Sequence, residues 1–400
     1  MWIEWNIAVK FLRESRSQTA LILVGIAVGV SVIVFISALI AGLQENIIER
    51  TLGTQAHIRV QSPDEANRTL PAAPGVIQLV LEDKRAQRLR SINNWQQVMI
   101  ELDGLADVTA VSPVLSGPAF ARRGVTLESV ALVGIDVARY QKIIPIADDI
   151  VAGSFRVGAG DAVIGKLLAD DLGLRVGDKL RLDAGRDAVT VVNVAGIFEL
   201  GVRELDSRYV YLDLKQTQSL LQLPGGVTVI DVTVRDIFSA DVVAARIARL
   251  TGLKSESWMQ TNAQLMNALT SQSLSTNMIS LFVALSVAFG IASVLSVSVV
   301  QRTREIGILR AMGTTQGQML WVFLIQGALF GLAGSAIGSA AGYALVWVFN
   351  TFGPKLFYIP VAASLVPIAM AIATVTGVIS AAIPARRAAR LDPVVAIRYV

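Results

Sequence analysis

Residues 301–316 read QRTREIGILRAMGTTQ and lie between two long apolar runs. No aspartate, glutamate, lysine or arginine occurs at positions 257–301 or 311–354. Long uncharged runs therefore separate the charged residues of this stretch from the others in the chain. One arginine at the centre of a membrane helix costs about 2.5–3.5 kcal/mol, and three would cost about 8–10 kcal/mol. The stretch is therefore expected at a membrane surface rather than within the membrane. Its four charged residues are Arg302, Arg304, Glu305 and Arg310.

The composition is that of a membrane protein. Of 400 residues, 53% are hydrophobic and 16% are charged, and the mean hydropathy is +0.58. These values are too apolar for an ordinary soluble protein. Cysteine is absent, which excludes a disulfide scaffold, a thiolate metal site and a cysteine nucleophile.

Four apolar runs are long enough to cross a membrane as helices: residues 20–43, 278–300, 319–349 and 361–383. At about 1.5 Å per residue, the first run gives a helix of about 36 Å, which exceeds the hydrocarbon thickness of about 30 Å. A cleaved signal peptide is the alternative for this first run. Its apolar core is too long for that, and no small-residue cleavage site follows, so we predict a retained helix.

Lysines and arginines gather on one side of the predicted spans, which indicates the orientation. They precede the first span, occupy residues 301–318 and follow the fourth span, whereas the short loop at 350–360 has only Lys355. Both termini, including the tail at 384–400, are therefore expected in the cytoplasm, and residues 44–277 outside it. The charges that set this orientation are Lys10, Arg13, Arg16, Arg302, Arg304, Arg310, Arg386, Arg387, Arg390 and Arg398.

Residues 1–19 are expected to form an amphipathic helix in the cytoplasmic membrane interface. Trp2, Trp5, Val9 and Leu12 recur there at helical spacing. The basic residues of the same segment can reach water or anionic headgroups.

The external region alternates strand and helix patterns and is predicted to be α+β. The simplest arrangement is one α/β unit, residues 44–136 and 227–260, interrupted by an inserted β-rich unit at 137–226. Residues 261–277 are polar, with a helical composition. They are interpreted as a stalk that continues the second span, and a plain linker is the alternative.

The third predicted span contains five glycines at intervals of three and four residues, a spacing that stacks them on one helix face. Such a face lets another helix backbone approach closely. The alternative is that glycine is common in membrane helices. The predicted packing residues are Gly327, Gly331, Gly334, Gly338 and Gly342.

Residues 301–318 are predicted to form a short amphipathic helix between two spans. Ile306, Ile308, Leu309 and Met312 supply its apolar side. Gly313 fits a helix end, and Thr315 with Gln318 fits a capping box that starts the next helix. Such a helix is suited to docking in a cleft of a cytoplasmic protein. An ordinary positively charged cytoplasmic loop remains an equal alternative from the residues alone.

Three motifs resemble one family in the same order along the chain. REIGILRAMGTT (304–315) resembles the coupling segment of MacB-like and lipoprotein-releasing ABC transporter permeases. IPARRAARLDPVVAIRY (383–399) and QTALILVGIAVGVSVIVFISALIAGLQ (18–44) are similar to its closing motif and first membrane helix. The resemblance implies four transmembrane helices and an external domain built as a split ferredoxin-like porter unit with an inserted β-rich unit.

The resemblance also implies that the chain is a permease subunit whose ATP hydrolysis occurs on a separate cytoplasmic ABC ATPase, present in two copies. ATP and Mg²⁺ would then bind the partner ATPase, and this chain would bind no cofactor. A second permease copy or a paralogue would complete the transporter. By resemblance, the residues that contact the ATPase are Arg304, Glu305, Ile306, Gly307, Arg310 and Gly313. Charge reversal at Glu305 or Arg310 is expected to uncouple the transporter without disturbing its fold.

Within this family the chain is most similar to lipoprotein-releasing permeases, in GKLLADDLGLRVGDKLRL (165–182), in FLIQGALFGLAGSAIGSAAG (323–342) and around Trp258. A lipoprotein or other amphipathic substrate would enter from the membrane and pass to a periplasmic chaperone or adaptor. The alternatives are an exporter of drugs, haem or glycolipids, and an FtsX-like regulator of a cell-wall hydrolase. The candidate substrate contacts are Phe35, Leu39, Leu43, Met278 and Phe282.

Three further features of the sequence support neither a catalytic nor a nucleic-acid-binding function. GDAVIGKL (160–167) nearly matches a phosphate-binding loop, but Leu167 replaces the hydroxyl residue that binds Mg²⁺. His57 is the sole histidine, and a single histidine is more often structural than a metal ligand. The charged stretch at 81–90 lacks interleaved aromatics. We therefore expect no enzyme activity, no metal site and no nucleic-acid partner.

Overall fold

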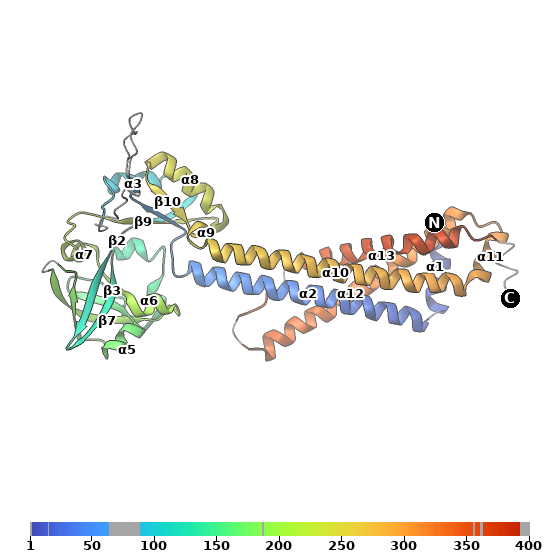
Figure 1. Cartoon of the computed structure of the whole chain (residues 1–400), viewed down its shortest axis with the longest axis horizontal. Coiled ribbons are helices and arrows are strands. Elements are labelled where there is room, and N and C mark those ends of the chain that lie inside the picture. The colour runs from blue at the N-terminus through green and yellow to red at the C-terminus, as the bar shows by residue number, and fades with distance from the viewer. Residues whose placement is uncertain are drawn as a thin grey trace, which may run out of the picture. The chain divides into compact units, whose positions relative to one another are not determined.

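The computed structural model describes residues 2–14, 16–63, 89–185, 188–354, 357–360 and 363–392. The chain divides into two compact units, one formed by Met1–Ile48 with Asn267–Val400 and the other by Glu49–Met266. Figure 1 traces the chain through both. Lys355, Arg398 and the side chain of Trp2, considered above, lie outside the described part.

The first unit is helical, and four of its helices are long and apolar enough to cross a membrane. Each of the four contains most or all of one predicted span, with mean hydropathies of 2.8, 2.4, 1.8 and 2.1 in chain order. The helices of this unit are α1 (Trp2–Glu14), α2 (Arg16–Leu52), α10 (Ala263–Gln301), α11 (Thr303–Ala311), α12 (Gln316–Phe352) and α13 (Leu365–Ala389).

All four helices extend beyond the predicted spans at one end or both, and α2 continues to Leu52, nine residues past the predicted end of the first span. α10 begins at Ala263, so the polar residues 263–277 are helical and continuous with the second span. α13 begins at Leu365 rather than at 361 and continues to Ala389. Pro384, one residue beyond the predicted end of this span, lies within the helix and is buried. In a membrane helix, neighbouring groups can satisfy the carbonyl that a proline leaves unpaired.

The five glycines of α12 lie where helix backbones meet, as predicted from their spacing. A Cβ added at Gly331 would lie 2.6 Å from the carbonyl oxygen of Ala373 on α13. One added at Gly338 would lie 2.6 Å from the carbonyl oxygen of Ala27 on α2. The glycine face of α12 therefore contacts two helices, one after the other along its length. Gly327 and Gly331 contact α13, whereas Gly334, Gly338 and Gly342 contact α2.

The second unit contains a ten-stranded sheet, and four of its strands form a ferredoxin-like layer. Their order is β10-β1-β9-β2, with every neighbouring pair antiparallel. One helix precedes β2 and another connects β9 to β10, which is the split βαβ arrangement implied by the family resemblance. The elements are β1 (Ile58–Gln61), α3 (Trp95–Asp103), β2 (Val108–Arg123), β9 (Val229–Val234), α8 (Ala240–Thr251) and β10 (Lys254–Ser257).

The inserted part is a closed barrel in which β2 also takes part. Strands pair in the order β2-β3-β8-β5-β7-β6, and β6 pairs back to β2. Apolar side chains such as Ala121, Leu132, Ile164 and Leu182 fill its interior. The strands are β3 (Thr126–Ile135), β5 (Asp161–Gly165), β6 (Lys179–Asp183), β7 (Val189–Phe198) and β8 (Tyr209–Asp213).

The barrel therefore begins earlier in the chain than the expected boundary at residue 137. Val108–Val114 of β2 pair with β9 of the ferredoxin-like layer, whereas Phe120–Arg122 pair with β6 of the barrel. One long strand thus belongs to both layers. The remaining elements are α4 (Val137–Tyr140), η1 (Ile146–Asp149), β4 (Ile150–Gly153), α5 (Lys166–Leu172), α6 (Arg203–Arg208), α7 (Leu214–Leu220), η2 (Ile237–Ser239) and α9 (Trp258–Thr261).

Asp231 is a buried carboxylate at the centre of the ferredoxin-like layer. It is 2% exposed, and its Oδ1 lies 3.5 Å from Nε of Arg59 on the neighbouring strand. That oxygen accepts no hydrogen bond from the residues that the structure describes. Burial raises the pKa of Asp231, and the Arg59 guanidinium opposes this only in part. The ionised carboxylate is therefore less stable in the fold than in water.

The raised pKa of Asp231 predicts that the second unit loses stability as the pH rises from about 4 through that pKa. Below the ordinary value of about 3.9 the carboxyl is neutral in both the folded and the unfolded chain. Above it the unfolded chain ionises first, which favours unfolding. Asp231→Asn cannot ionise, so its Tm should increase relative to that of the wild type as the pH rises. Each kcal/mol of unfolding free energy that the wild type loses should lower its Tm by about 2–4 °C.

Thermal unfolding of the full-length protein in detergent, between about pH 4 and pH 8, measures this difference. Asp171→Asn, which removes an exposed carboxylate on α5, is the control. A Tm difference between Asp231→Asn and the wild type that does not change with pH would contradict the role of burial.

Candidate functional site

Helix α11 is held between α10 and α12 by a short connection at each end. Arg302 is its N-cap residue, and the chain turns after it at Gly313, where φ is +103°. This backbone conformation favours glycine. Thr315 and Gln318 then form a capping box at the start of α12. The predicted helix end and the predicted capping box are both confirmed.

One face of α11 is exposed and carries four side chains that we call the α11 stripe: Arg304, Glu305, Ile308 and Met312. Positions 304, 308 and 312 recur every four residues and so share a helix face. Ile308 is 43% exposed and Met312 is 72% exposed. An exposed apolar pair bordered by charges of both signs is suited to contact with another protein.

The opposite face of α11 holds the helix on the bundle. Ile306 is fully buried and belongs to a cluster that includes Met319 and Ala385. Gly307 is also buried. Neither residue presents a side chain at the surface, so of the predicted ATPase contacts these two fit a packing role better. Met312 and Ile308 are exposed on the same face as Arg304 and were not among the predicted contacts, although their spacing from Arg304 could have placed them on that face.

Arg310 ties α11 to the end of α13. Its Nη1 donates to the carbonyl oxygen of Ala389 at 3.1 Å and also to that of Leu391. The last carbonyls of a helix lack partners within that helix, and Arg310 supplies one. The expectation that Arg310→Glu leaves the fold undisturbed is therefore revised, because this change removes the donor and places a carboxylate beside carbonyl oxygens.

Arg302 ties the other end of α11 to α1 and was absent from the predicted site. It is 7% exposed, and its Nη2 donates to the carbonyl oxygen of Phe11 at 2.9 Å. Its Nη1 donates to Glu14 at 2.9 Å and to Glu305 at 3.4 Å. In sequence this arginine resembles its neighbour Arg304, so no local signal separates the buried one from the exposed one.

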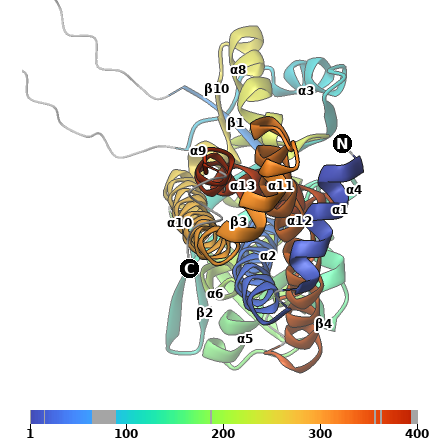
Figure 2. The same ribbon diagram turned by 90° about the vertical axis from the view of Figure 1, so that its right-hand side faces the viewer.

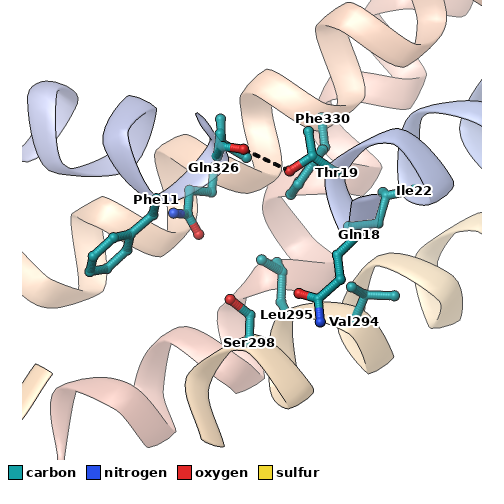
Figure 3. A pocket seen from close by; sticks show the side chains of 10 residues that line it. Phe11, Gln18, Thr19, Ile22, Val294, Leu295, Ser298, Gln326 and Phe330 are labelled. Atoms are coloured by element: carbon teal, nitrogen blue, oxygen red, sulfur yellow. Dashed lines mark hydrogen bonds between the residues drawn. The ribbon is translucent and has the colours of Figure 1, made fainter. Parts of the chain in front are cut away.

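A small cavity lies close to this contact, where α1, α2, α10 and α12 meet (Figure 3). Its volume is about 20 Å³, the size of a site for one water molecule. Gln326 and Ser298 contribute polar side chains to its wall. Thr19 also lines it and donates to the carbonyl oxygen of Leu12 at 3.0 Å, the dashed line in Figure 3. The cavity is too small for a substrate.

The five candidate substrate contacts fall into different surroundings. Phe35 and Leu39 pack with Phe349 in a cluster at one end of α12, and the two phenyl rings are 6.4 Å apart. Met278 and Phe282 are exposed on α10. Leu43 is partly buried. The structure thus brings Phe35 and Leu39 together, and a substrate role for any of the five stays a prediction.

The weak catalytic signals have structural explanations. Gly165 ends β5 and caps α5, and Nζ of Lys166 lies 2.7 Å from a carboxylate oxygen of Glu199. Nδ1 of His57 accepts from the backbone N–H of Val234 at 3.2 Å, and burial lowers the pKa of His57. Within the described residues no group of three or more histidine and acidic residues could hold a metal ion.

Two protein families match the chain. The FtsX-like permease C-terminal family matches residues 277–393, which include α11, α12 and α13. The MacB-like periplasmic core domain family matches residues 19–250, which is more than half of the chain.

Relatives of two kinds are similar over nearly the whole chain. The lipoprotein-releasing system transmembrane protein LolC of Xylella fastidiosa (strain Temecula1) is 26% identical over 98% of both chains. LolC of Neisseria meningitidis serogroup B is 21% identical over 99% of both. The macrolide export ATP-binding/permease protein MacB of Shewanella oneidensis is 28% identical over 98% of this chain and 60% of its own length.

Among solved structures, the periplasmic region of MacB from Actinobacillus actinomycetemcomitans is similar, with 13% identity and a TM-score of 0.36. The matched region covers 55% of this chain and 96% of the MacB chain in that structure. The two family matches and the four candidate membrane spans agree with the motifs first seen in the sequence. The chain belongs to the ABC transporter permeases of the LolC/MacB type, multi-pass membrane proteins with a MacB-like periplasmic core domain.

Proposed function

We propose that this chain is the non-catalytic permease subunit of a transporter in a bacterial inner membrane, with its α/β unit in the periplasm. A separate cytoplasmic ABC ATPase, in two copies, binds ATP and Mg²⁺ and docks on the α11 stripe. A second permease, identical or a paralogue, completes the complex. The substrate is a lipoprotein that the transporter extracts from the inner membrane for transfer to the outer membrane.

The observation that carries this proposal is the exposed α11 stripe on a helix tied down at both ends. Arg302 joins one end of α11 to α1, and Arg310 joins the other end to α13. Because both ends are tied, a displacement of the stripe is passed to the membrane helices rather than absorbed in a loose loop. An ABC permease needs a partner ATPase, and the stripe is a suitable surface for it.

Lipoprotein release is supported by the LolC relatives, which are similar over 98–99% of both chains, and by the stretches at 165–182 and 323–342 that resemble lipoprotein-releasing permeases. Export of a drug, haem or glycolipid through an adaptor is the second candidate, because that MacB relative is itself 28% identical. Regulation of a cell-wall hydrolase is a third, suggested by the FtsX-like C-terminal match.

Mass spectrometry of the molecules that co-purify with the permease and its ATPase tests the substrate. We expect an acylated lipoprotein to be bound without ATP and lost when ATP is added. ADP in place of ATP, and a cargo variant that cannot be acylated, are the controls. Neither ADP nor loss of the acyl chains should reproduce the ATP-dependent release.

Two results would count against lipoprotein release. If only phospholipid co-purifies while the ATPase remains bound, the permease assignment stands and the exporter becomes the better candidate. If the cargo is retained in ATP as firmly as in ADP, ATP hydrolysis is not used to extract it.

A further inference from the structure

Arg302 is a buried cation whose partners come mainly from outside its own helix. Its guanidinium lies 4.5 Å from the ring centroid of Phe11, whose carbonyl oxygen it also contacts. Glu14 and Glu305 share Nη1, and both carboxylates reach the surface, with side chains 45% and 54% exposed. A buried arginine requires such a set of partners, since an unpaired buried charge is strongly destabilising.

Helix α1 also contacts α12, through apolar side chains, through Gln326 and through a hydrogen bond between Glu4 and Gln318. Ala8 and Phe11 form a small buried cluster with Val322 of α12, and Leu309 of α11 packs against it. The side-chain amide of Gln326 donates to the carbonyl oxygen of Ala8 at 3.4 Å, a long hydrogen bond. Figure 2 shows α1 lying beside α12.

The contacts of Arg302 are therefore the strongest polar link in this region between α1 and the start of α11. One side of α11 is the exposed stripe, and part of its other side rests on α1 through Leu309. If α1 moved away, the start of α11 would lose the carbonyl and the carboxylate that hold Arg302, together with an apolar support.

We propose that Arg302 is a positioning residue that clamps α1 onto the junction of α10 and α11, which makes α1 a part of the coupling device. This inference rests on the proposed docking of an ATPase at the α11 stripe. With the clamp closed, α1, α11 and the end of α10 move as one body. With it open, the stripe still binds the ATPase, but its displacement no longer reaches α10.

The absence of native cysteine provides a clean test. Ala8→Cys and Val322→Cys place one thiol on α1 and one on α12, in the same buried cluster. In the protein that keeps the native Arg302, the two cysteines should form a disulfide readily under mild oxidation. In Arg302→Gln, disulfide formation should slow at least about fivefold, because α1 spends time away from α12. This measurement needs no ATPase.

The functional arm compares cargo released per ATP in membranes that contain the complete transporter. Arg302→Gln should retain the bound ATPase but release at least about fivefold less cargo per ATP. In the same variant, a disulfide between positions 8 and 322 should restore the yield, and a reductant should abolish the rescue. Lys10→Gln is the matched control, because Lys10 is an exposed partner of Glu14, 3.9 Å away.

Three results would overturn the clamp: no disulfide in the Arg302 background, an unchanged rate in Arg302→Gln, or a loss of coupling that the disulfide does not repair. Failure of the proposed function looks different. In that case the ATPase does not bind the wild-type permease, while the disulfide measurement still reports whether α1 is clamped.

Discussion

Gly331→Leu is expected to destabilise the helical unit severely, so that little folded protein is recovered in detergent. A Cβ at this position would lie 2.6 Å from the carbonyl oxygen of Ala373 and 2.7 Å from the Cα of Thr374, both backbone atoms of α13. Overpacking a well-packed core costs about 1–3 kcal/mol and occasionally more. Since backbone cannot rotate away as a side chain can, we expect the loss to exceed about 3 kcal/mol.

The yield of monodisperse protein and its thermal unfolding in detergent measure this loss. Gly290→Leu on α10 and Gly25→Leu on α2 are matched controls, because nothing lies within 4 Å of a Cβ added at either position. Leucine is a much better helix former than glycine, which is about 0.8–1 kcal/mol less favourable than alanine, so the controls should be neutral or slightly stabilising. If Gly331→Leu is as stable as these controls, α12 and α13 do not pack as closely as the structure shows.

The helical unit could be predicted well because its signals are local. Long apolar runs, the glycine spacing in α12, the turn at Gly313 and the capping box of Thr315 with Gln318 each depend on residues close together in the chain. The surrounding fold did not have to be known to interpret them. The exception is the extent of α13, which begins at Leu365 and continues through Pro384 to Ala389, beyond the predicted end at residue 383.

The α/β unit could be predicted only in outline, because strand pairing depends on distant residues. Nothing in the residues of β2 shows that its first half pairs with β9 and its second half with β6. The ferredoxin-like layer was expected from a family resemblance rather than from a strand pattern. Closure of the barrel through β6 was not expected at all.

The candidate site shows the same division between local and distant information. Arg302, Arg304 and Arg310 are alike in sequence, yet one is clamped to α1, one is exposed and one contacts the end of α13. Two partners of Arg302 lie 288 and 291 residues earlier in the chain, and a partner of Arg310 lies 79 residues later. Their separate roles follow from tertiary contacts and could not be read from spacing.

Met312→Asp is expected to abolish docking of the ATPase while leaving the permease folded. Met312 and Ile308 are the apolar centre of the α11 stripe, and the few hot-spot residues of an interface, which gather near its centre, each contribute about 2 kcal/mol or more to binding. Aspartate would have to lose its hydration there without a designed partner. We expect the ATPase to bind at least about thirtyfold more weakly, which corresponds to about 2 kcal/mol.

Binding of the ATPase to the purified permease, together with ATP hydrolysis in membranes, measures this effect. Val125→Asp adds the same charge at a residue that is 98% exposed in the turn between β2 and β3, and should leave binding unchanged. Ile308→Asp should behave as Met312→Asp does, because both side chains lie on one helix face. If both stripe variants bind the ATPase as the wild type does, α11 is not the docking element. The basic surface formed by the exposed Arg386 and Arg387 of α13 would then be the next to change by substitution.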